Sequence, residues 1–222
     1  MRSHMVLGEF TATGLHGWLL PRVLTLPGVS NDSRVLDIGC GTGAWLARLH
    51  RAGFTHLTGI DRRSDYFGAS DVATFVQGDV AQGERAEMGA FDLITAIEVF
   101  EHMANPEAIF AFASQHLGAG GWFIVTTPNI YSVRVRMRFL LSGQLTWFER
   151  NAEPEHIHPL ILDAVKRQIL PKYSLAVDRA LTYPERGTNS SRWFARLAAS
   201  GLSLVLPNAL PGDSLCLFLK KH

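Results

Sequence analysis

The chain has few of the residues that would suit an oxidising compartment or a membrane. Its 222 residues contain two cysteines, Cys40 and Cys216, which lie far apart in the sequence. A disulfide-stapled fold is therefore excluded, and a reducing, cytoplasmic setting is expected. No apolar run suits a transmembrane helix, because prolines 207 and 211 interrupt the uncharged stretch 197–212.

An excess of charge of one sign is also missing. The 21 Lys and Arg residues nearly balance the 20 Asp and Glu residues, so a net charge of +1 provides no bulk attraction to nucleic acid. We expect a small-molecule partner instead. The sequence does not indicate an oligomeric state. The opening residues MRSHM resemble a vector-derived leader. Residues 1–28 are accordingly assigned to a leader and a helix, and residues 29–222 to a single domain.

Short apolar runs alternate with helical segments from residue 34 onward. Strands are expected at 34–38, 56–60, 74–77, 91–97, 122–127, 174–181 and 214–219. Helices are expected at 44–52, 106–117, 160–170 and 191–199, with a further helix over 11–26 that breaks at Pro21 and Pro27. The glycines at 118–121 are expected to stop the helix at 106–117. This alternation predicts an α/β fold: a Rossmann-like, seven-stranded, mainly parallel sheet with helices on both faces.

A glycine-rich segment, VLDIGCGTG at 35–43, follows the first strand and opens a helix. Glycine is needed there because the backbone must turn sharply and let a ligand approach closely. The free N–H groups of the helix start would attract a negative group. Gly39, Gly41 and Ala44 also fit G-x-G-x-x-A, with Asp61 at the ribose-binding position. A nicotinamide or flavin enzyme is therefore one interpretation.

Acidic residues at the strand ends favour a different ligand. Asp37 would lie beside positive charge, such as the sulfonium and amino groups of S-adenosylmethionine. Asp79, which follows the third strand, would reach the adenine end. The run Glu98–His102 follows the fourth strand at its carboxyl end, where open α/β sheets bind their ligands.

Together these motifs resemble those of the class I S-adenosylmethionine-dependent methyltransferases. Residues 35–43 look like the first motif, 58–61 like the ribose motif and 77–80 like the adenine motif. The run from 98 to 129 is similar to ubiquinone-biosynthesis-type O-methyltransferases and to the type 11 and type 23 groups. The resemblance covers about residues 34–170. It implies S-adenosylmethionine as donor, S-adenosylhomocysteine as product, and a fold with an insertion after strand 5 at about 130–159.

The resemblance also assigns roles to residues. The cofactor-binding set is Asp37, Gly39, Cys40, Gly41, Gly43, Asp61, Arg62, Asp79, Val80, Ile97 and Glu98. The expected reaction is an in-line displacement that requires mainly positioning. The expected acceptor is a hydroxyl, rather than a nitrogen, of a small molecule, sugar or lipid precursor. A non-catalytic cofactor-binding subunit is an alternative.

The catalytic candidates Glu98, Glu101 and His102 admit three interpretations. In the first, Glu98 helps to hold the methionine end or the floor of the site, and His102 packs or caps. In the second, His102 acts as general base on the acceptor, since an imidazole titrates near neutral pH. In the third interpretation they hold a divalent metal, with His156 or His158 as a distant ligand. That arrangement resembles small-RNA 3′-end methyltransferases, so a metal-dependent RNA methyltransferase is a further alternative.

Four residues of the insertion are substrate candidates: Tyr131, Arg134, Arg138 and His158. Arg134 and Arg138 are four apart and share a helix face, with Arg136 opposite. They form either a clamp for a phosphate or carboxylate or a solvated face. Tyr131 lines the acceptor pocket or is a core aromatic, and Trp193 and Phe194 are expected in the core.

Overall fold

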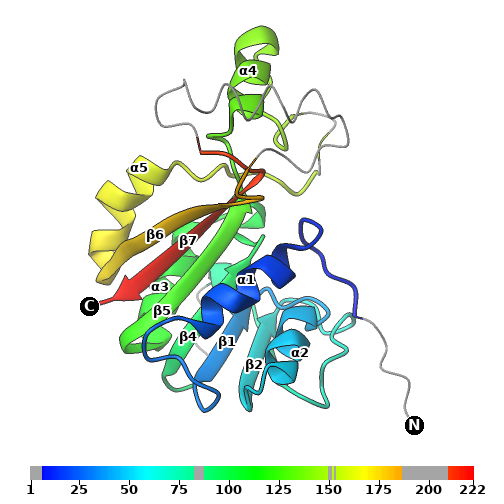
Figure 1. Cartoon of the computed structure of the whole chain (residues 1–222), viewed down its shortest axis with the longest axis vertical. Coiled ribbons are helices and arrows are strands. Elements are labelled where there is room, and N and C mark those ends of the chain that lie inside the picture. Colours follow the sequence, from blue (N-terminus) through cyan, green and yellow to red (C-terminus); the bar gives the residue numbers. More distant parts are fainter. Residues whose placement is uncertain (1–6, 83–87, 150–151, 153, 187–209) are drawn as a thin grey trace.

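A single sheet of seven strands organises the chain (Figure 1). The computed structural model describes residues 7–82, 88–149, 152, 154–186 and 210–222. The strands are β1 (Arg34–Ile38), β2 (His56–Asp61), β3 (Thr74–Gln77), β4 (Phe91–Ile97), β5 (Leu117–Pro128), β6 (Leu175–Tyr183) and β7 (Ser214–Lys221). Their order is β3-β2-β1-β4-β5-β7-β6, and only the pairs that β7 makes with β5 and β6 are antiparallel. The predicted α/β, mainly parallel sheet is confirmed.

Helices cover both faces of this sheet, as predicted. The α-helices are α1 (Leu15–Leu24), α2 (Ala44–Arg51), α3 (Glu107–His116), α4 (Val133–Ser142) and α5 (Leu162–Ala164). After α5 the chain continues through a π-helical turn (Val165–Ile169) and a 3₁₀ turn (Leu170–Tyr173), and shorter 3₁₀ turns lie at Val80–Gln82 and Phe100–His102. One hydrophobic cluster packs α1 and α2 against the sheet, and a second packs α3 and α5 against the opposite face.

The central strands supply both clusters because alternate side chains point to opposite faces. Along β5, Trp122 and Ile124 join the cluster under α1 and α2, whereas Phe123 and Val125 join the cluster under α3. These side chains are at most 2% exposed. Strands buried on both faces read as continuous apolar runs, and this is why most strand positions could be predicted from the sequence.

Two local predictions were wrong. Pro21 does not break the first helix but lies inside α1, because Leu15, Leu19 and Val23 are fully buried and outweigh the missing backbone donor. The strand expected at 122–127 begins earlier, at Leu117, so the glycines at 118–121, which follow the end of α3 at His116, lie inside β5. Its register on β4 is irregular there, which makes the glycines a bulge within the strand. The helix predicted at 191–199, with Trp193 and Phe194, lies outside the described residues.

Between β5 and α5 the chain leaves the body of the sheet. In Figure 1, α4 stands beyond the end of the sheet, and no strand occurs among the described residues from 130 to 159. The Ser132 hydroxyl caps α4 by accepting from Val135 N at 3.3 Å, and Gly143 ends it with a φ of 67°. Within the described part of the chain, no helix has the length and apolarity needed to cross a membrane.

Candidate active site at the carboxyl ends of β1 and β4

The strand order reverses between β1 and β4, which are neighbours in the sheet but far apart in the chain. The connections that leave the two strands run in opposite directions and open a crevice at their carboxyl ends. The glycine loop follows β1, and Glu98 follows β4. The sequence motifs therefore meet at the point where this class of sheet binds its ligands.

The glycine loop has a backbone that other residues would strain. Gly39, Gly41 and Gly43 have φ values of 67°, 49° and 78°. A Cβ atom on Gly39 would lie 2.5 Å from Val99 Cγ2, and one on Gly43 would lie 2.5 Å from Ala69 Cβ. The loop is thus closely packed from outside, as well as turned sharply.

Asp61, at the end of β2, holds the loop in place. Its Oδ2 accepts a hydrogen bond from Gly41 N at 2.9 Å, and its Oδ1 accepts one from Arg63 N at 3.0 Å. Arg62 is exposed and contributes its carbonyl, which accepts from Gln77 Nε2 at 3.1 Å. Asp61 therefore joins the glycine loop to the end of β2. A ribose bound as predicted would share the Asp61 carboxylate with the loop.

Asp37 is a buried acid under the loop. Asp37 is 3% exposed, and its Oδ1 accepts a hydrogen bond from Thr95 Oγ1 at 2.7 Å. Burial raises the pKa of Asp37 to about 7; the Thr95 hydrogen bond opposes this, and the nearby Asp61 charge adds to it. Among the described residues no cation pairs with Asp37. The site therefore contains a carboxylate that a cationic ligand would stabilise.

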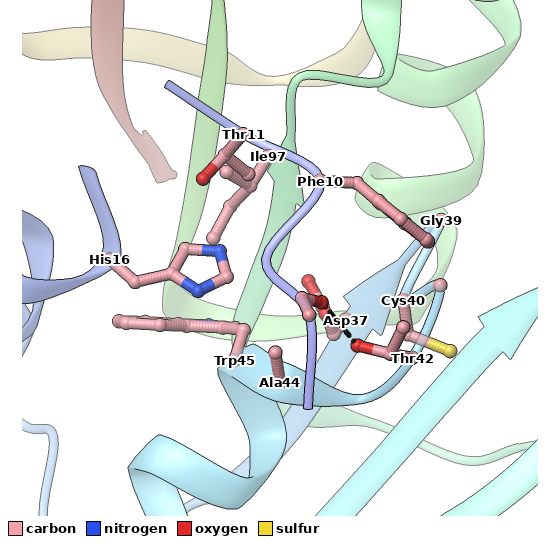
Figure 2. Close-up of a pocket in the computed structure, with 12 residues that line it drawn as sticks. Phe10, Thr11, His16, Asp37, Gly39, Cys40, Thr42, Ala44, Trp45 and Ile97 are labelled. Atoms are coloured by element: carbon pink, nitrogen blue, oxygen red, sulfur yellow. Dashed lines mark hydrogen bonds between the residues drawn. The ribbon is translucent and has the colours of Figure 1, made fainter. Parts of the chain in front are cut away.

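A pocket lies above Asp37 (Figure 2). From the β1–α2 region it is lined by Asp37, Gly39, Cys40, Gly41, Thr42, Ala44 and Trp45, and from β4 by Ile97. Four further lining residues come from the N-terminal segment: Gly8, Phe10, Thr11 and His16. Figure 2 shows His16 and Trp45 together at one side of the pocket and Phe10 near Gly39, and the His16 and Trp45 ring centroids are 5.3 Å apart.

The sequence analysis missed this N-terminal contribution. Thr42 Oγ1 donates to Gly8 O at 2.7 Å, so the segment is tied to the glycine loop. Glu9 bonds to Arg48 of α2 at 2.5 Å and lies 3.4 Å from His16 Nδ1. Burial lowers the pKa of His16, against the effect of Glu9. The available signal was His16 itself, a polar residue on the apolar stripe of α1.

The remaining cofactor candidates lie around this crevice with differing exposure. Asp79 turns toward its own loop, where its Oδ1 accepts from Ala81 N at 2.9 Å and its Oδ2 from Gln82 Nε2 at 3.0 Å. Val80 is 6% exposed and packs in the cluster under α3. Cys40 and Ile97 are each 7% exposed and line the pocket, and burial raises the pKa of the Cys40 thiol.

Glu98 has a strained backbone, with a φ of 54° in the left-handed region. Its N–H donates to Thr126, and its Oε1 accepts from Thr126 Oγ1 at 3.0 Å. Burial raises the pKa of Glu98 to about 7, while hydrogen bonds from Thr126 and Ser214 oppose the rise. Strain of this kind is kept where surrounding contacts impose it, and it often marks a functional position.

The structure brings Glu101, His102 and His156 together. One potential ligand atom from each lies within 4.8 Å of the others, and the His102 and His156 ring centroids are 4.7 Å apart. Glu101 is fully buried, which raises its pKa well above the ordinary value, and the nearby Glu98 charge raises it further. The nearby Thr127 hydroxyl opposes this rise in pKa, but among the described residues neither Glu101 oxygen has a partner within hydrogen-bond geometry.

Backbone hydrogen bonds hold the insertion against this cluster. Ile157 N and His158 N donate to Glu101 O at 2.9 and 3.1 Å. The His158 ring points elsewhere, with Nδ1 2.7 Å from Met103 O. Of the two distant ligands considered from the sequence, His156 therefore reaches the cluster and His158 does not.

The other substrate candidates already have protein partners. Tyr131 packs against the core, and its hydroxyl accepts from Leu162 N at 2.8 Å. Arg134 lies 3.7 Å from Asp213, and Arg138 lies 2.9 Å from Glu149. These contacts favour a core position for Tyr131 and ion pairing within the protein for the two arginines, and the predicted substrate contacts stay predictions.

Comparison with curated proteins finds relatives among methyltransferases. The chain is 33% identical over 104 residues to the ubiquinone biosynthesis O-methyltransferase of Aromatoleum aromaticum. That alignment covers 43% of this chain and 44% of the relative. The chain therefore spans less than half the length of this relative.

Comparison with solved structures finds the same fold. An S-adenosylmethionine-dependent methyltransferase from Archaeoglobus fulgidus superposes with a TM-score of 0.64 and 19% identity, covering 93% of this chain and 92% of the other. A magnesium protoporphyrin IX methyltransferase from Synechocystis, with bound S-adenosylhomocysteine, has a TM-score of 0.54 and 17% identity. It covers 94% of this chain and 80% of the other. At these identities the likeness supports the fold alone.

A family model described as a methyltransferase domain matches residues 18–170, which is more than half of the chain. The match includes the glycine loop, Asp61, the Glu98–His102 run and the insertion. The expected methyltransferase family is thereby confirmed, and the nicotinamide or flavin interpretation is set aside. The chain belongs to the methyltransferase-domain family, the class I S-adenosylmethionine-dependent methyltransferases.

Proposed function

We propose that the chain transfers the methyl group of S-adenosylmethionine to a hydroxyl of a small molecule, sugar or lipid precursor. The observation that carries the donor assignment is Asp37, a buried carboxyl beneath the glycine loop with no cationic partner among the described residues. A donor with sulfonium and amino groups would supply the missing positive charge.

The donor would be held along the crevice. The N–H groups at the start of α2 suit its carboxylate, the Asp61 carboxylate suits its ribose hydroxyls, and the Asp79–Val80 turn suits its adenine. Cys40, Ile97 and the newly found His16 and Trp45 would pack around it. Residues 29–222 would act as one domain, with 130–159 covering the acceptor side.

The reaction we propose is a direct displacement. The acceptor oxygen forms a bond to the methyl carbon while the carbon–sulfur bond breaks, and sulfur keeps the electron pair in S-adenosylhomocysteine. The acceptor proton passes to His102, with Glu98 or Glu101 able to receive it in turn. The sulfide leaves readily, so the main task of the protein is to hold the two reactants in line.

A second candidate makes this transfer metal-dependent. Glu101, His102 and His156 present one carboxylate and two imidazoles within 4.8 Å, a donor set that suits Mn²⁺ or Zn²⁺. The buried Glu101 oxygens without hydrogen bonds fit this interpretation, since a cation would satisfy them. A bound metal would supply Lewis-acid polarisation of the acceptor oxygen. The same chemistry would serve the RNA 3′-end alternative, which the near-neutral charge disfavours.

Calorimetric titration with S-adenosylmethionine and, separately, with NAD tests the donor. We expect binding of the first alone, and NAD binding without S-adenosylmethionine binding would reject the proposal. His102→Ala separates an enzyme from a cofactor-binding subunit. We expect it to keep donor affinity and to lose methyl transfer in an assay that follows S-adenosylhomocysteine over a panel of hydroxyl acceptors.

A further inference from the structure

The C-terminal end of α4 is an exposed apolar tip. Phe139, Leu140 and Leu141 are consecutive and are 57%, 76% and 80% exposed. Consecutive helical residues point about 100° apart, so three in a row spread over about 200° of the helix rather than forming one narrow stripe. A helix that packs on its own core would bury such residues on one face. This tip is therefore built to contact something outside the described part of the chain.

The first part of α4, residues 133–138, forms a stem that is anchored in the protein. Val133 and Val135 are 4% and 0% exposed, and the Ser132 cap fixes the first turn. Figure 1 shows α4 projecting beyond the sheet at one end of the long axis of the molecule. An anchored stem that presents an apolar end outward lets the tip enter a partner while the body stays outside.

The stem also carries positive charge, which indicates an anionic partner. Arg134, Arg136 and Arg138 lie along it, and α4 contains no acidic residue. The acids that pair with two of these arginines lie underneath them. The Asp213 and Glu149 side chains are 11% and 14% exposed, whereas Arg134 and Arg138 are each 41% exposed. The surface of α4 behind the apolar tip therefore exposes the guanidinium groups of Arg134 and Arg138 to solvent.

We propose that α4 docks the protein on an anionic membrane surface. The three apolar side chains enter the boundary between headgroups and acyl chains, and the arginines lie at the level of the lipid phosphates. An apolar groove of a protein would match the tip alone, whereas an anionic membrane surface matches both the apolar tip and the three arginines behind it. The segment that carries α4 also carries His156, so docking would bring a membrane-embedded acceptor to the site. That last consequence rests on the proposed function.

Vesicle co-sedimentation tests the proposal. We use vesicles of phosphatidylcholine alone and vesicles that contain about one third phosphatidylglycerol, at low and high salt. We expect binding to the anionic vesicles that weakens with salt. In the Phe139→Ser, Leu140→Ser, Leu141→Ser variant the partition coefficient should fall at least about tenfold, because the buried apolar area is lost. Leu24→Ser removes a 46% exposed leucine from α1 and should bind like the wild type.

Two outcomes would overturn the proposal: no sedimentation of the wild type with anionic vesicles, or equal sedimentation of the triple variant. If the first is found together with a wild-type dimer that becomes a monomer in the triple variant, the tip is a contact between two copies of the chain. Melting temperatures check that the variant is folded, and Leu141→Ser alone repeats the test with a smaller change. Vesicle binding needs neither donor nor acceptor. Its failure would therefore leave the methyl-transfer proposal standing, and failure of methyl transfer would leave docking standing.

Discussion

Replacing Asp37 with asparagine should stabilise the unliganded protein while weakening its hold on the donor. Burial raises the pKa of Asp37 from 3.8 to about 7, so the folded protein binds a proton there more tightly than the unfolded chain does. The free energy of unfolding must then fall as pH rises from about 4 to about 7. Asparagine keeps an acceptor for the Thr95 hydroxyl, which donates at 2.7 Å, but carries no charge to bury.

The magnitude follows from the pKa change, since each unit corresponds to about 1.4 kcal/mol. Relative to the wild type, Asp37→Asn should gain about 2 kcal/mol between pH 4 and pH 5.5 and about 4 kcal/mol by pH 8.5. Any fixed cost of exchanging a neutral carboxyl for an amide is the same at every pH. The pH dependence of the difference, rather than its absolute value, is therefore the quantity to measure.

Urea unfolding of both proteins from pH 4 to pH 8.5 provides this difference. Asp178→Asn, which removes an exposed carboxylate from β6, is a control for the loss of one surface charge. Calorimetry at pH 8 should show at least about tenfold weaker binding of S-adenosylmethionine, since about 1.4 kcal/mol of charge attraction corresponds to that factor. A stability difference that stays constant with pH, or undiminished donor affinity, would refute the reasoning.

Three further predictions concern the loop, the cluster and the insertion. Gly41→Ala places a Cβ 3.3 Å from the Phe10 ring at a φ of 49°, so we expect a loss of about 1–2 kcal/mol in unfolding free energy and weaker donor binding, measured by urea titration and calorimetry. If Glu101, His102 and His156 hold a metal, His156→Ala should abolish Mn²⁺ or Zn²⁺ binding in calorimetry while His158→Ala retains it, and equal binding by both variants would exclude that site. If Arg134 and Arg138 clamp an acidic acceptor, their double alanine variant should raise the acceptor KM at least about tenfold. An unchanged KM would assign them to their ion pairs with Asp213 and Glu149.

The sequence predicted the strands and the glycine loop because their physics is local. A strand buried on both faces must be apolar throughout, and a backbone with positive φ must be glycine, so both can be read from consecutive residues. Pro21 was misinterpreted because the burial of the α1 face is a tertiary property that propensity does not contain. The bulge at 118–121 depends on the register with β4, which is equally non-local.

The sequence predicted the donor side of the candidate site better than it predicted the N-terminal segment and the insertion. The donor side lies at strand ends, where order in the sequence fixes position in space. The N-terminal segment, with Phe10 and His16 in the pocket, crosses the loop from more than 20 residues away and carries no motif. In the insertion, two histidines two residues apart looked equivalent. The folded path of the backbone turns the His156 ring toward His102 and the His158 ring toward Met103 O, and consecutive residues do not reveal that path.

Those two hydrogen bonds, from Ile157 N and His158 N to Glu101 O, have a consequence for protein engineering. They fasten the segment that would choose the acceptor to the turn that carries His102. Grafting an insertion from another methyltransferase, a natural way to seek new acceptors, would therefore reposition the turn that carries His102 as well. Swaps that keep residues 156–158 and their backbone path should preserve turnover, whereas swaps cut inside that stretch should exchange specificity and lose activity together.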